Sequence, residues 1–349
     1  MPTVQKVKSV ELESFCSKIL QKIGLTKNDA EHVSSLLVEA DLRDHSTHGV
    51  VRLATYVDLV KHNVINTQPN IKVVSDRKAT GTIDGDHGFG QIIASKAMDL
   101  AIQKAQTYGI GMVGVINSGH LGELGLIAKQ VVPHRMVGSI STNGGPMMAP
   151  TGGSQPILGN NPFAVCIPRR RDTPIVVDMA LSKTARGNII LAEKEGREIP
   201  EGWALDQSGN PTTDPKDALL GSVLPMAGHK GYSLALLNEI MSSALIGGTP
   251  GYSLGMLTPP DYDKPLRVSH SVTAVNIEHF TEWDAFQDQL DNLIDTIKTS
   301  AKQGETIYIP GERSEESYKR LLKTNIELSV GIIEELKRLG EEYDVAFPD

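Results

Sequence analysis

The stretch Gly109-Ile110-Gly111-Met112-Val113-Gly114-Val115-Ile116 decides between two fold classes. Its glycines match the G-x-G-x-x-G motif, which in a dinucleotide-binding Rossmann fold follows a strand and opens a helix. Here the order is reversed, because residues 91–108 have the apolar spacing of a helix and Met112–Ile116 that of a buried strand. We therefore interpret Gly109 as the end of a helix and reject a conventional dinucleotide-binding domain.

The segments around this stretch alternate between helical and extended spacing. The chain begins with two amphipathic helices, the first ended by Gly24 and the second capped by Thr26, with Asp29 three residues on. Strands are predicted within 69–85 and 176–180. Further helices are predicted over 122–135, 233–245 and 283–301, and one charged helix near the C-terminus.

The composition is that of an ordinary globular protein with 349 residues, enough for two compact units. A net charge of −8 and the lack of a Lys/Arg-rich stripe argue against a nucleic-acid partner. No apolar run is long enough to span a membrane, and the N-terminus lacks an apolar signal core. Cys16 and Cys166 are the only cysteines, so neither a disulfide framework nor a CxxC zinc pattern is expected. These features predict a cytoplasmic protein.

The segment Ser46-Thr47-His48-Gly49-Val50-Val51-Arg52 places an imidazole four residues before a guanidinium. If the segment is helical or turns sharply, His48 and Arg52 share one face. An imidazole exchanges protons near neutral pH, and a guanidinium binds a carboxylate through two parallel bonds. The pair therefore suits a small acid whose neighbouring carbon changes oxidation state. The alternative is a surface histidine beside an ordinary arginine.

Two further stretches carry polar groups close to glycines. His120 lies in the Gly-flanked turn 117–122 after the predicted buried strand, where α/β proteins often place reactive side chains. The alternative is a histidine that only satisfies local backbone groups. Lys230 lies between glycines before a predicted helix, where it could hold a phosphate or carboxylate as a point charge.

Eight short motifs occur in an order that resembles the malate/L-lactate dehydrogenase family, which also includes ureidoglycolate, sulfolactate and diketogulonate dehydrogenases. The resemblance extends over nearly the whole chain. The motifs are STHGxxR (46–52), SGHxG (118–122), GNNPFA (159–164), VDMA (177–180), IPEGWALD (199–206), GNPTTDP (209–215), HKGY (229–232) and IPGE (309–312).

This resemblance implies an α/β (α+β) protein with a mostly antiparallel sheet flanked by helices, a separate helical domain and no Rossmann fold. We expect the helical domain to comprise residues 1–70 and 310–349, and the α/β domain that binds cofactor and substrate to comprise 71–309. The resemblance also implies a homodimer that uses NAD or NADP, with NAD favoured. The expected partner is a small-molecule carboxylate substrate.

Site residues follow from the matching positions of the family motifs. His120 matches the proton acceptor of some members, and His48 the proton donor of others. Arg52 matches the arginine that binds the substrate carboxylate, with Ser46 and Thr47 beside it. The expected cofactor-binding residues are Gly144, Asn161, Asp178, Met179, Ala180, His229, Lys230, Gly311, Glu312 and Arg313.

The predicted reaction is hydride transfer between nicotinamide and C2 of a small 2-hydroxy or 2-keto acid, with His120 exchanging the proton and His48 assisting. Within the enzyme class, reduction of a cyclic imine or of a sugar-derived keto acid remains an alternative. A non-catalytic NAD(P)-binding homologue is a second alternative. A metal-dependent hydrolase using His45, His48, His87 or His120 is a third, although no metal-ligand spacing supports it and no metal is predicted.

Overall fold

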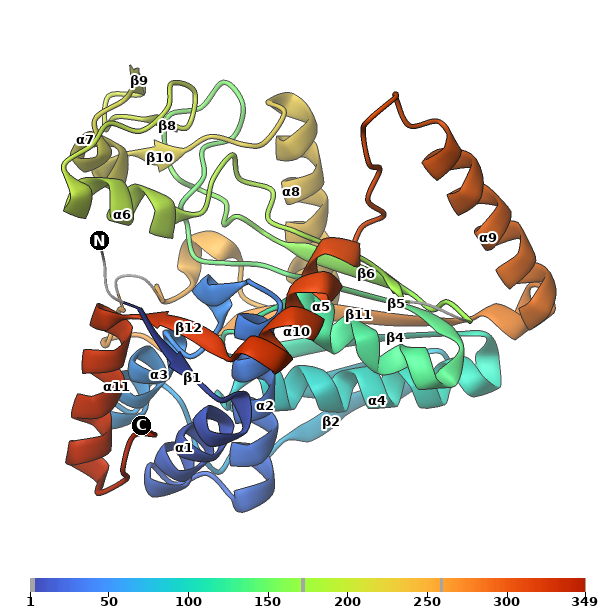
Figure 1. Ribbon diagram of the computed structural model, residues 1–349, viewed down its shortest axis with the longest axis horizontal. Coiled ribbons are helices and arrows are strands. Elements are labelled where there is room, and N and C mark those ends of the chain that lie inside the picture. The colour runs from blue at the N-terminus through green and yellow to red at the C-terminus, as the bar shows by residue number, and fades with distance from the viewer. Residues whose placement is uncertain (1–3, 171–172, 258–259, 349) are drawn as a thin grey trace.

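The computed structural model describes residues 4–170, 173–257 and 260–348, and its centre is a twisted sheet of seven strands (Figure 1). Neighbouring strands are antiparallel except for the parallel pair β3–β4. The mixed, mostly antiparallel sheet confirms the predicted fold class. In spatial order the strands are β2 (Lys72–Arg77), β3 (Thr80–Asp84), β4 (Ile110–Ser118), β11 (Val268–Asn276), β5 (Met136–Thr142), β6 (Phe163–Ile167) and β7 (Ile175–Met179).

The glycines at 109, 111 and 114 serve helix–sheet packing. Helix α4 (Gly90–Tyr108) connects β3 to β4 and ends at Gly109, whose φ of +81° is left-handed. A Cβ on Gly111 would collide with the carbonyl oxygen of Ala101 in α4. A Cβ on Gly114 would lie 2.5 Å from Ile246 Cγ2. The glycines therefore follow a helix and lie within a strand, as predicted from their order.

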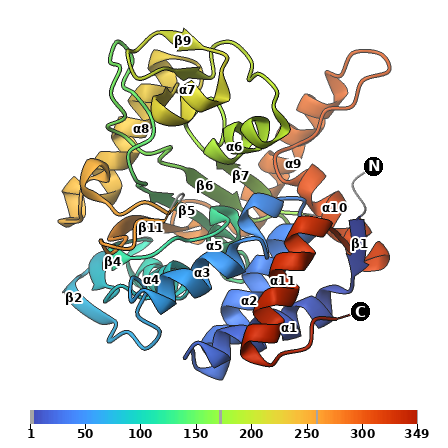
Figure 2. The ribbon, with the colours of Figure 1, turned by 90° about the vertical axis from the view of Figure 1, so that its left-hand side faces the viewer.

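Segments from both ends of the chain share one hydrophobic core (Figure 2). The predicted caps of the first two helices are confirmed, since Gly24 follows the end of α1 and Thr26 accepts a hydrogen bond from the Asp29 amide. The domain boundaries at 70 and 310 stay a prediction. The elements of this region are β1 (Val4–Val7), α1 (Ser9–Lys22), α2 (Lys27–Leu42), η1 (Ser46–His48), α3 (Arg52–Lys61), α10 (Glu312–Thr324), β12 (Ile326–Ser329) and α11 (Val330–Tyr343).

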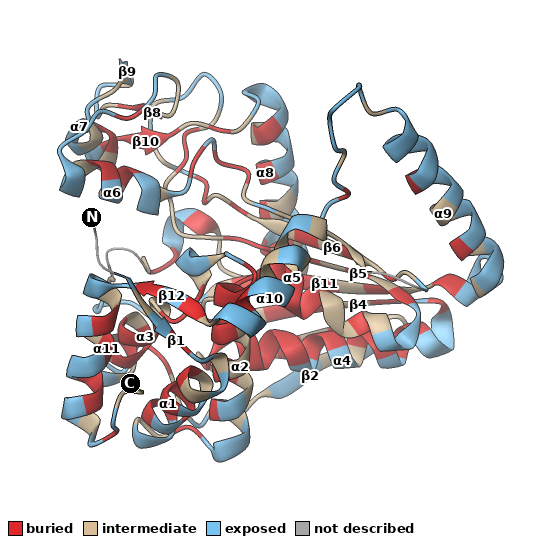
Figure 3. Ribbon diagram, viewed as in Figure 1, coloured by how far each residue is buried: buried red, intermediate tan, exposed pale blue. Residues whose placement is uncertain are grey.

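A lobe above the sheet has a small core of its own (Figure 1). Helix α9 (Trp283–Thr299) projects from the body, and its surface is mostly exposed in Figure 3. The lobe comprises α6 (Arg186–Glu195), β8 (Ala204–Leu205), β9 (Pro211–Thr212), α7 (Pro215–Leu220), β10 (Ser222–Val223) and α8 (His229–Ser242). The short turns η3 (Ala244–Ile246) and η4 (Gly251–Ser253) follow α8, and η5 (Ile277–His279) connects β11 to α9.

Two predicted helices differ from the structure. The helix expected over 122–135 is a short α5 (Leu124–Ala128) followed by the 3₁₀ turn η2 (Lys129–His134), because Pro133 has no N–H to continue an α-helix. The single C-terminal helix is instead α10 and α11, separated by β12, which pairs with β1. Across 4–170, 173–257 and 260–348, no helix is long and apolar enough to cross a membrane.

Candidate active site

The candidate site lies at one end of the sheet, where several strand ends meet. His120 follows the C-terminal end of β4, and Thr142 is the last residue of β5. His270, near the start of β11, pairs with Val115 of β4 and Thr142 of β5. The antiparallel register therefore brings segments far apart in sequence to one edge.

The turn that carries His48 rests on a buried carboxylate. Asp41 Oδ2 accepts a hydrogen bond from the Val50 amide at 2.8 Å. The same carboxylate occupies the place where a side chain on Gly49 would extend, so this position requires glycine. The chain can then pass directly from η1 into α3, which begins at Arg52. The predicted proximity of His48 and Arg52 is met, and Arg52 Nε donates to the Thr47 carbonyl at 2.6 Å.

The rings of His48 and His120 lie nearly parallel. Their centroids are 5.9 Å apart and their planes differ by 11°. The Tyr56 hydroxyl lies 2.8 Å from His120 Nδ1, and Gln91 Nε2 donates to that hydroxyl, also at 2.8 Å. The structure thus brings together His48, Arg52 and His120, which the sequence analysis selected from separate motifs.

Both histidines are held neutral at pH 7. Burial, together with the positive charges of Arg52 and His45, lowers the pKa of His48 to about 4. Burial and the charge of Arg52 also lower the pKa of His120 well below its ordinary value. A bound anion would raise both pKa values, because its charge offsets that of the guanidinium.

A second titratable group lies beside this pair. His45 Nδ1 is 3.1 Å from Glu123 Oε1, and this hydrogen bond raises the pKa of His45. Asp178, at the end of β7, accepts a hydrogen bond from the Gly125 amide at 2.7 Å. Burial raises the pKa of Asp178 to about 6, with a further contribution from the charge of Glu123. The charge of Asp178 raises the pKa of His45, and the charge of His45 lowers the pKa of Asp178. The predicted cofactor residue and His45 therefore influence each other's protonation.

Two of the predicted cofactor residues form a buried hydrogen-bond network. Asn161 Oδ1 accepts from the Gly144 amide at 3.1 Å. The Asn161 amide nitrogen donates to Ala235 O at 3.0 Å and to Glu239 Oε2 at 2.9 Å. Since its side chain is used internally, Asn161 shapes the loop around Gly144 rather than offering an amide to a ligand.

The other predicted cofactor residues lie along β7 and at two helix N-termini. Met179 is exposed, and Ala180 follows it at the end of the strand. Leu181 accepts a hydrogen bond from Met226, which brings this end of β7 near the start of α8. His229 and Lys230 are exposed in the first turn of α8, which has no side-chain cap. Exposed amide groups and a lysine at a helix start fit a phosphate group.

The IPGE motif also adjoins β7. The Val176 amide donates to Pro310 O at 3.0 Å, and Gly311 precedes α10 with a φ of +98°. Glu312 accepts from Lys298 Nζ at 2.6 Å and from the Ile309 amide at 2.9 Å, so its carboxylate stabilises this turn. The Arg313 guanidinium lies 4.5 Å from the centre of the Tyr308 ring.

Sequence reasoning missed five side chains around these histidines. His270 Nδ1 is 2.8 Å from the Thr142 hydroxyl, and burial lowers its pKa to about 3. Only Tyr56 offered a signal, since it lies one helical turn after Arg52. Asp41 and Glu123 are close in sequence to His48 and His120 but belong to no motif, and Gln91 and His270 come from distant segments. The missed residues are Asp41, Tyr56, Gln91, Glu123 and His270.

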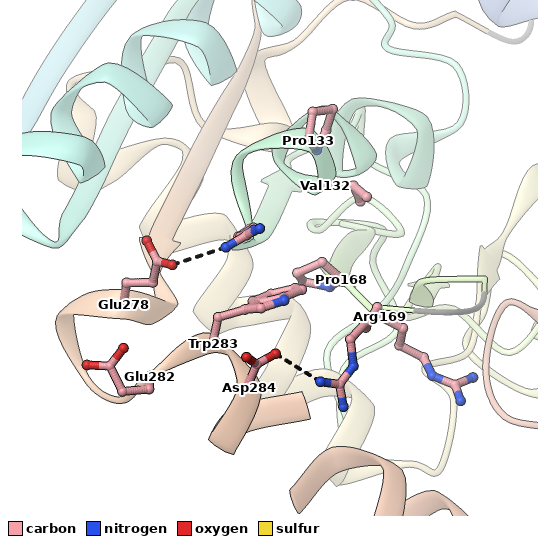
Figure 4. Close-up of a pocket in the computed structure, with 10 residues that line it drawn as sticks. Val132, Pro133, Pro168, Arg169, Glu278, Glu282, Trp283 and Asp284 are labelled. Carbon is pink, nitrogen blue, oxygen red and sulfur yellow. Dashed lines mark hydrogen bonds and ion pairs between the residues drawn. The ribbon is translucent and has the colours of Figure 1, made fainter. Parts of the chain in front are cut away.

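A cavity of about 590 Å³ lies at the opposite end of the sheet, near the start of α9 (Figure 4). Arg135 forms an ion pair with Glu278 at 3.4 Å, and Arg170 forms one with Asp284 at 2.9 Å. These guanidinium groups are already matched by carboxylates, which makes the cavity a poor site for an acidic substrate. In the part of the chain that the structure describes, no group of three or more His, Cys, Asp or Glu side chains could hold a metal ion.

Comparisons with known proteins agree with this geometry. A model of the malate/L-lactate dehydrogenase family matches residues 7–337. The malate/(S)-sulfolactate dehydrogenase of Methanothermus fervidus is 35% identical over 335 residues, covering 96% of this chain and 97% of that protein. The malate dehydrogenase of Pyrococcus abyssi is 38% identical over 345 residues, covering 96% of this chain and 94% of that protein. The solved sulfolactate dehydrogenase of Methanocaldococcus jannaschii aligns with a TM-score of 0.91 at 35% identity, covering 98% of each chain.

The fold and the site, taken with these relatives, define an oxidoreductase that acts on the CH–OH group of hydroxy acids. The relation extends over nearly the whole chain and includes both the helical region and the sheet. The chain belongs to the malate/L-lactate dehydrogenase family. Membership implies a nicotinamide cofactor, and one relative, from Chromohalobacter salexigens, is named as an NADP(+)-dependent (2R)-3-sulfolactate dehydrogenase.

Proposed function

We propose that this protein interconverts a small 2-hydroxy acid and its 2-keto acid, with Arg52 binding the carboxylate. The observation that carries the proposal is the placement of Arg52 beside the stacked rings of His48 and His120. A guanidinium that grips the carboxylate fixes the neighbouring carbon against the two imidazoles. The bound nicotinamide supplies or takes the hydride at this carbon.

In this proposal His120 exchanges the proton with the substrate oxygen, and His48 donates a hydrogen bond to that oxygen or shares the proton. Ser46 and Thr47 lie at the exposed side of the same turn and contact the substrate. Binding of the carboxylate at Arg52 offsets the positive charge that keeps both rings neutral, so substrate binding itself favours protonation for the reductive direction.

The cofactor-binding residues are proposed to be those along β7 and at the starts of α8 and α10. Lys230 and the uncapped first turn of α8 would hold a phosphate. Gly144, Asp178, Met179 and Ala180 would line the remainder through backbone groups and the β7 end, with His229, Gly311, Glu312 and Arg313 at the periphery. We favour NAD over NADP.

We also propose that the protein is a homodimer in the cytoplasm. Leucine and isoleucine side chains on α8 and α9 are exposed at helical spacing, which favours self-association: Leu234, Leu237, Ile240, Leu293 and Ile297. Both cysteines, Cys16 and Cys166, are free thiols and buried, which suits a reducing compartment. Size-exclusion chromatography with light scattering tests the dimer.

The first experiment follows absorbance at 340 nm with NADH and with NADPH against oxaloacetate, pyruvate and sulfopyruvate. Oxidation with one of these acids is the expected result and identifies substrate and cofactor together. Cyclic imino acids and sugar-derived keto acids complete the panel. Binding of NAD(P)H without turnover of any compound would overturn the proposal and favour a non-catalytic homologue.

A further inference from the structure

A chain of two buried side chains leads to Nδ1 of His120, in which Tyr56 contacts the ring and Gln91 contacts Tyr56. Tyr56 comes from α3 and Gln91 from the first turn of α4, and each is only 1% exposed. The Tyr56 hydroxyl lies 2.8 Å from His120 Nδ1, and Gln91 Nε2 donates to the Tyr56 oxygen at 2.8 Å. The pair therefore links the helical region to the sheet layer through the histidine.

The direction of these bonds determines which nitrogen of His120 holds the proton. Because Gln91 donates to the Tyr56 oxygen, the Tyr56 proton points to Nδ1. The Gly122 amide also donates to Nδ1, at 3.3 Å. A nitrogen that accepts these bonds carries no proton, so neutral His120 is protonated at Nε2. In this state Nε2 can donate a hydrogen bond to a substrate oxygen but cannot take a proton from it.

The other end of the Gln91 amide has no hydrogen-bond partner among the residues that the structure describes. Its Oε1 is buried and unsatisfied, which is unfavourable because a buried acceptor without a donor loses its hydrogen bonds to water. A half-turn of the amide would direct Oε1 to Tyr56, whose hydroxyl would then donate to it. The Tyr56 oxygen could then accept a bond from a proton on His120 Nδ1, with loss of the long bond from the Gly122 amide. This state leaves Nε2 free to exchange a proton.

We propose that Gln91, acting through Tyr56, switches His120 between a hydrogen-bond donor and an acid–base group. Tyr56 and Gln91 are positioning residues, and His120 is the group that meets the substrate. In the turned state, reduction moves the Nε2 proton of the imidazolium to the substrate oxygen and leaves the second proton on Nδ1. Oxidation returns the hydroxyl proton to Nε2. This assignment rests on the proposed function, although the position of the proton on the free ring does not.

The charged and titratable groups that face the His120 ring all bear on this switch. His48, Arg52 and Tyr56 face it from η1 and α3, and His270 faces it from β11. Positive charge on Arg52, His48 or His270 disfavours the imidazolium. The substrate carboxylate opposes this effect, so the turned state is expected mainly in the presence of substrate.

The first test locates the proton directly, by ¹⁵N NMR of protein labelled at histidine, without substrate. His120→Gln identifies the His120 signals among those of the ten histidines. We expect a protonated Nε2 and an unprotonated Nδ1 in the wild type, and a mixture of tautomers in Tyr56→Phe. A proton on Nδ1 in the wild type, or a Tyr56→Phe spectrum equal to that of the wild type, would overturn the proposal.

The second test compares Gln91→Met with Gln91→Glu. Methionine has a similar length but cannot accept the Tyr56 proton, so kcat for alcohol oxidation should fall by about 100-fold or more, with a small change in substrate KM. Glutamate accepts that proton and adds negative charge. Gln91→Glu should therefore retain turnover and move the acidic limb of kcat/KM to higher pH.

Phe89→Leu is the matched control, because the Phe89 ring packs edge-on against Tyr56 at 5.7 Å and is equally buried. It should disturb packing without moving the acidic limb. The proposal would be overturned by equal losses of kcat in Gln91→Met and Phe89→Leu, together with an unchanged pH profile of kcat/KM in all three variants. Such a result would show that Tyr56 and Gln91 only contribute to packing. A wild type that turns over no hydroxy acid would instead refute the proposed function and leave the NMR result valid.

Discussion

His45 and His48 lie within one turn of the same loop, yet their surroundings act on them in opposite directions. The hydrogen bond to Glu123 raises the pKa of His45. Burial and the charge of Arg52 lower the pKa of His48 to about 4. One ring therefore has a carboxylate partner that favours its protonated form, and the other is a neutral ring beside a guanidinium. The comparison separates a histidine suited to bonding within the protein from one suited to a ligand.

The strongest test of this comparison removes each ring in turn. His120→Ala and His48→Ala should lower kcat by about 100- to 10,000-fold, because a positioned acid–base group contributes that much. His45→Ala should have a much smaller effect. Steady-state kinetics with the accepted keto acid measure all three, and isothermal titration with NAD(P)H checks that cofactor binding survives. A loss in His45→Ala as deep as in His48→Ala would remove the distinction.

The opposite pKa shifts predict opposite effects on stability. His45 contributes stability that is present below its ordinary value of 6.5 and is lost as the pH rises through its raised folded value. His48 resists protonation in the folded state, so its contribution is lost as the pH falls from 6.5 towards about 4. Glu123→Gln should lower the pKa of His45, leave that of His48 near its value and destabilise the protein more at about pH 5.5 than at about pH 8.

Histidine NMR titrations and urea unfolding at the two pH values measure these effects. Glu123→Asp is the conservative control, since it retains the carboxylate on a shorter side chain. Equal destabilisation of Glu123→Gln at both pH values would contradict the linkage between His45 and Glu123.

Gly49, directly after His48, offers a test of how His48 is positioned. Gly49→Ala should destabilise the protein by about 1–3 kcal/mol, because its Cβ would collide with the Asp41 carboxylate. Gly187→Ala, in α6, is the control, since nothing lies within 4 Å of the added Cβ. Urea unfolding measures both changes. A Gly49→Ala protein as stable and active as Gly187→Ala would show that the turn tolerates a side chain.

The smallest expected effect lies away from the histidines. Lys230→Ala should raise the cofactor KM by up to about 5-fold, which corresponds to the loss of an exposed ion pair with a phosphate, while the helix N-terminus stays in place. Its kcat should change little, because Lys230 is exposed on α8 and has no part in the proton exchange. Initial rates over a range of cofactor concentrations decide this, with Lys230→Arg expected to retain most of the affinity. A fall in kcat alone would contradict the phosphate role.

The sequence was most informative where a feature is local. The order of helix, glycine and strand around Gly109 excluded a Rossmann domain, and the spacing from His48 to Arg52 placed both beside one turn. Contacts between distant segments had no such signal. Gln91 meets Tyr56 across 35 residues, and Glu123 meets His45 only after α4 and β4 have been placed. The pairing of β1 with β12 was missed for the same reason, since each strand has only four residues.

Strand β11 has a consequence for the way the chain folds during synthesis. It lies between β4 and β5, yet His270 follows its partner Thr142 by 128 residues. On the ribosome, β4 and β5 therefore emerge long before the strand that joins them, and each has an open edge until then. Such long-range pairing is slow, because the loop between the strands must be closed before their contacts form. The histidine cluster is completed only when the central strand inserts.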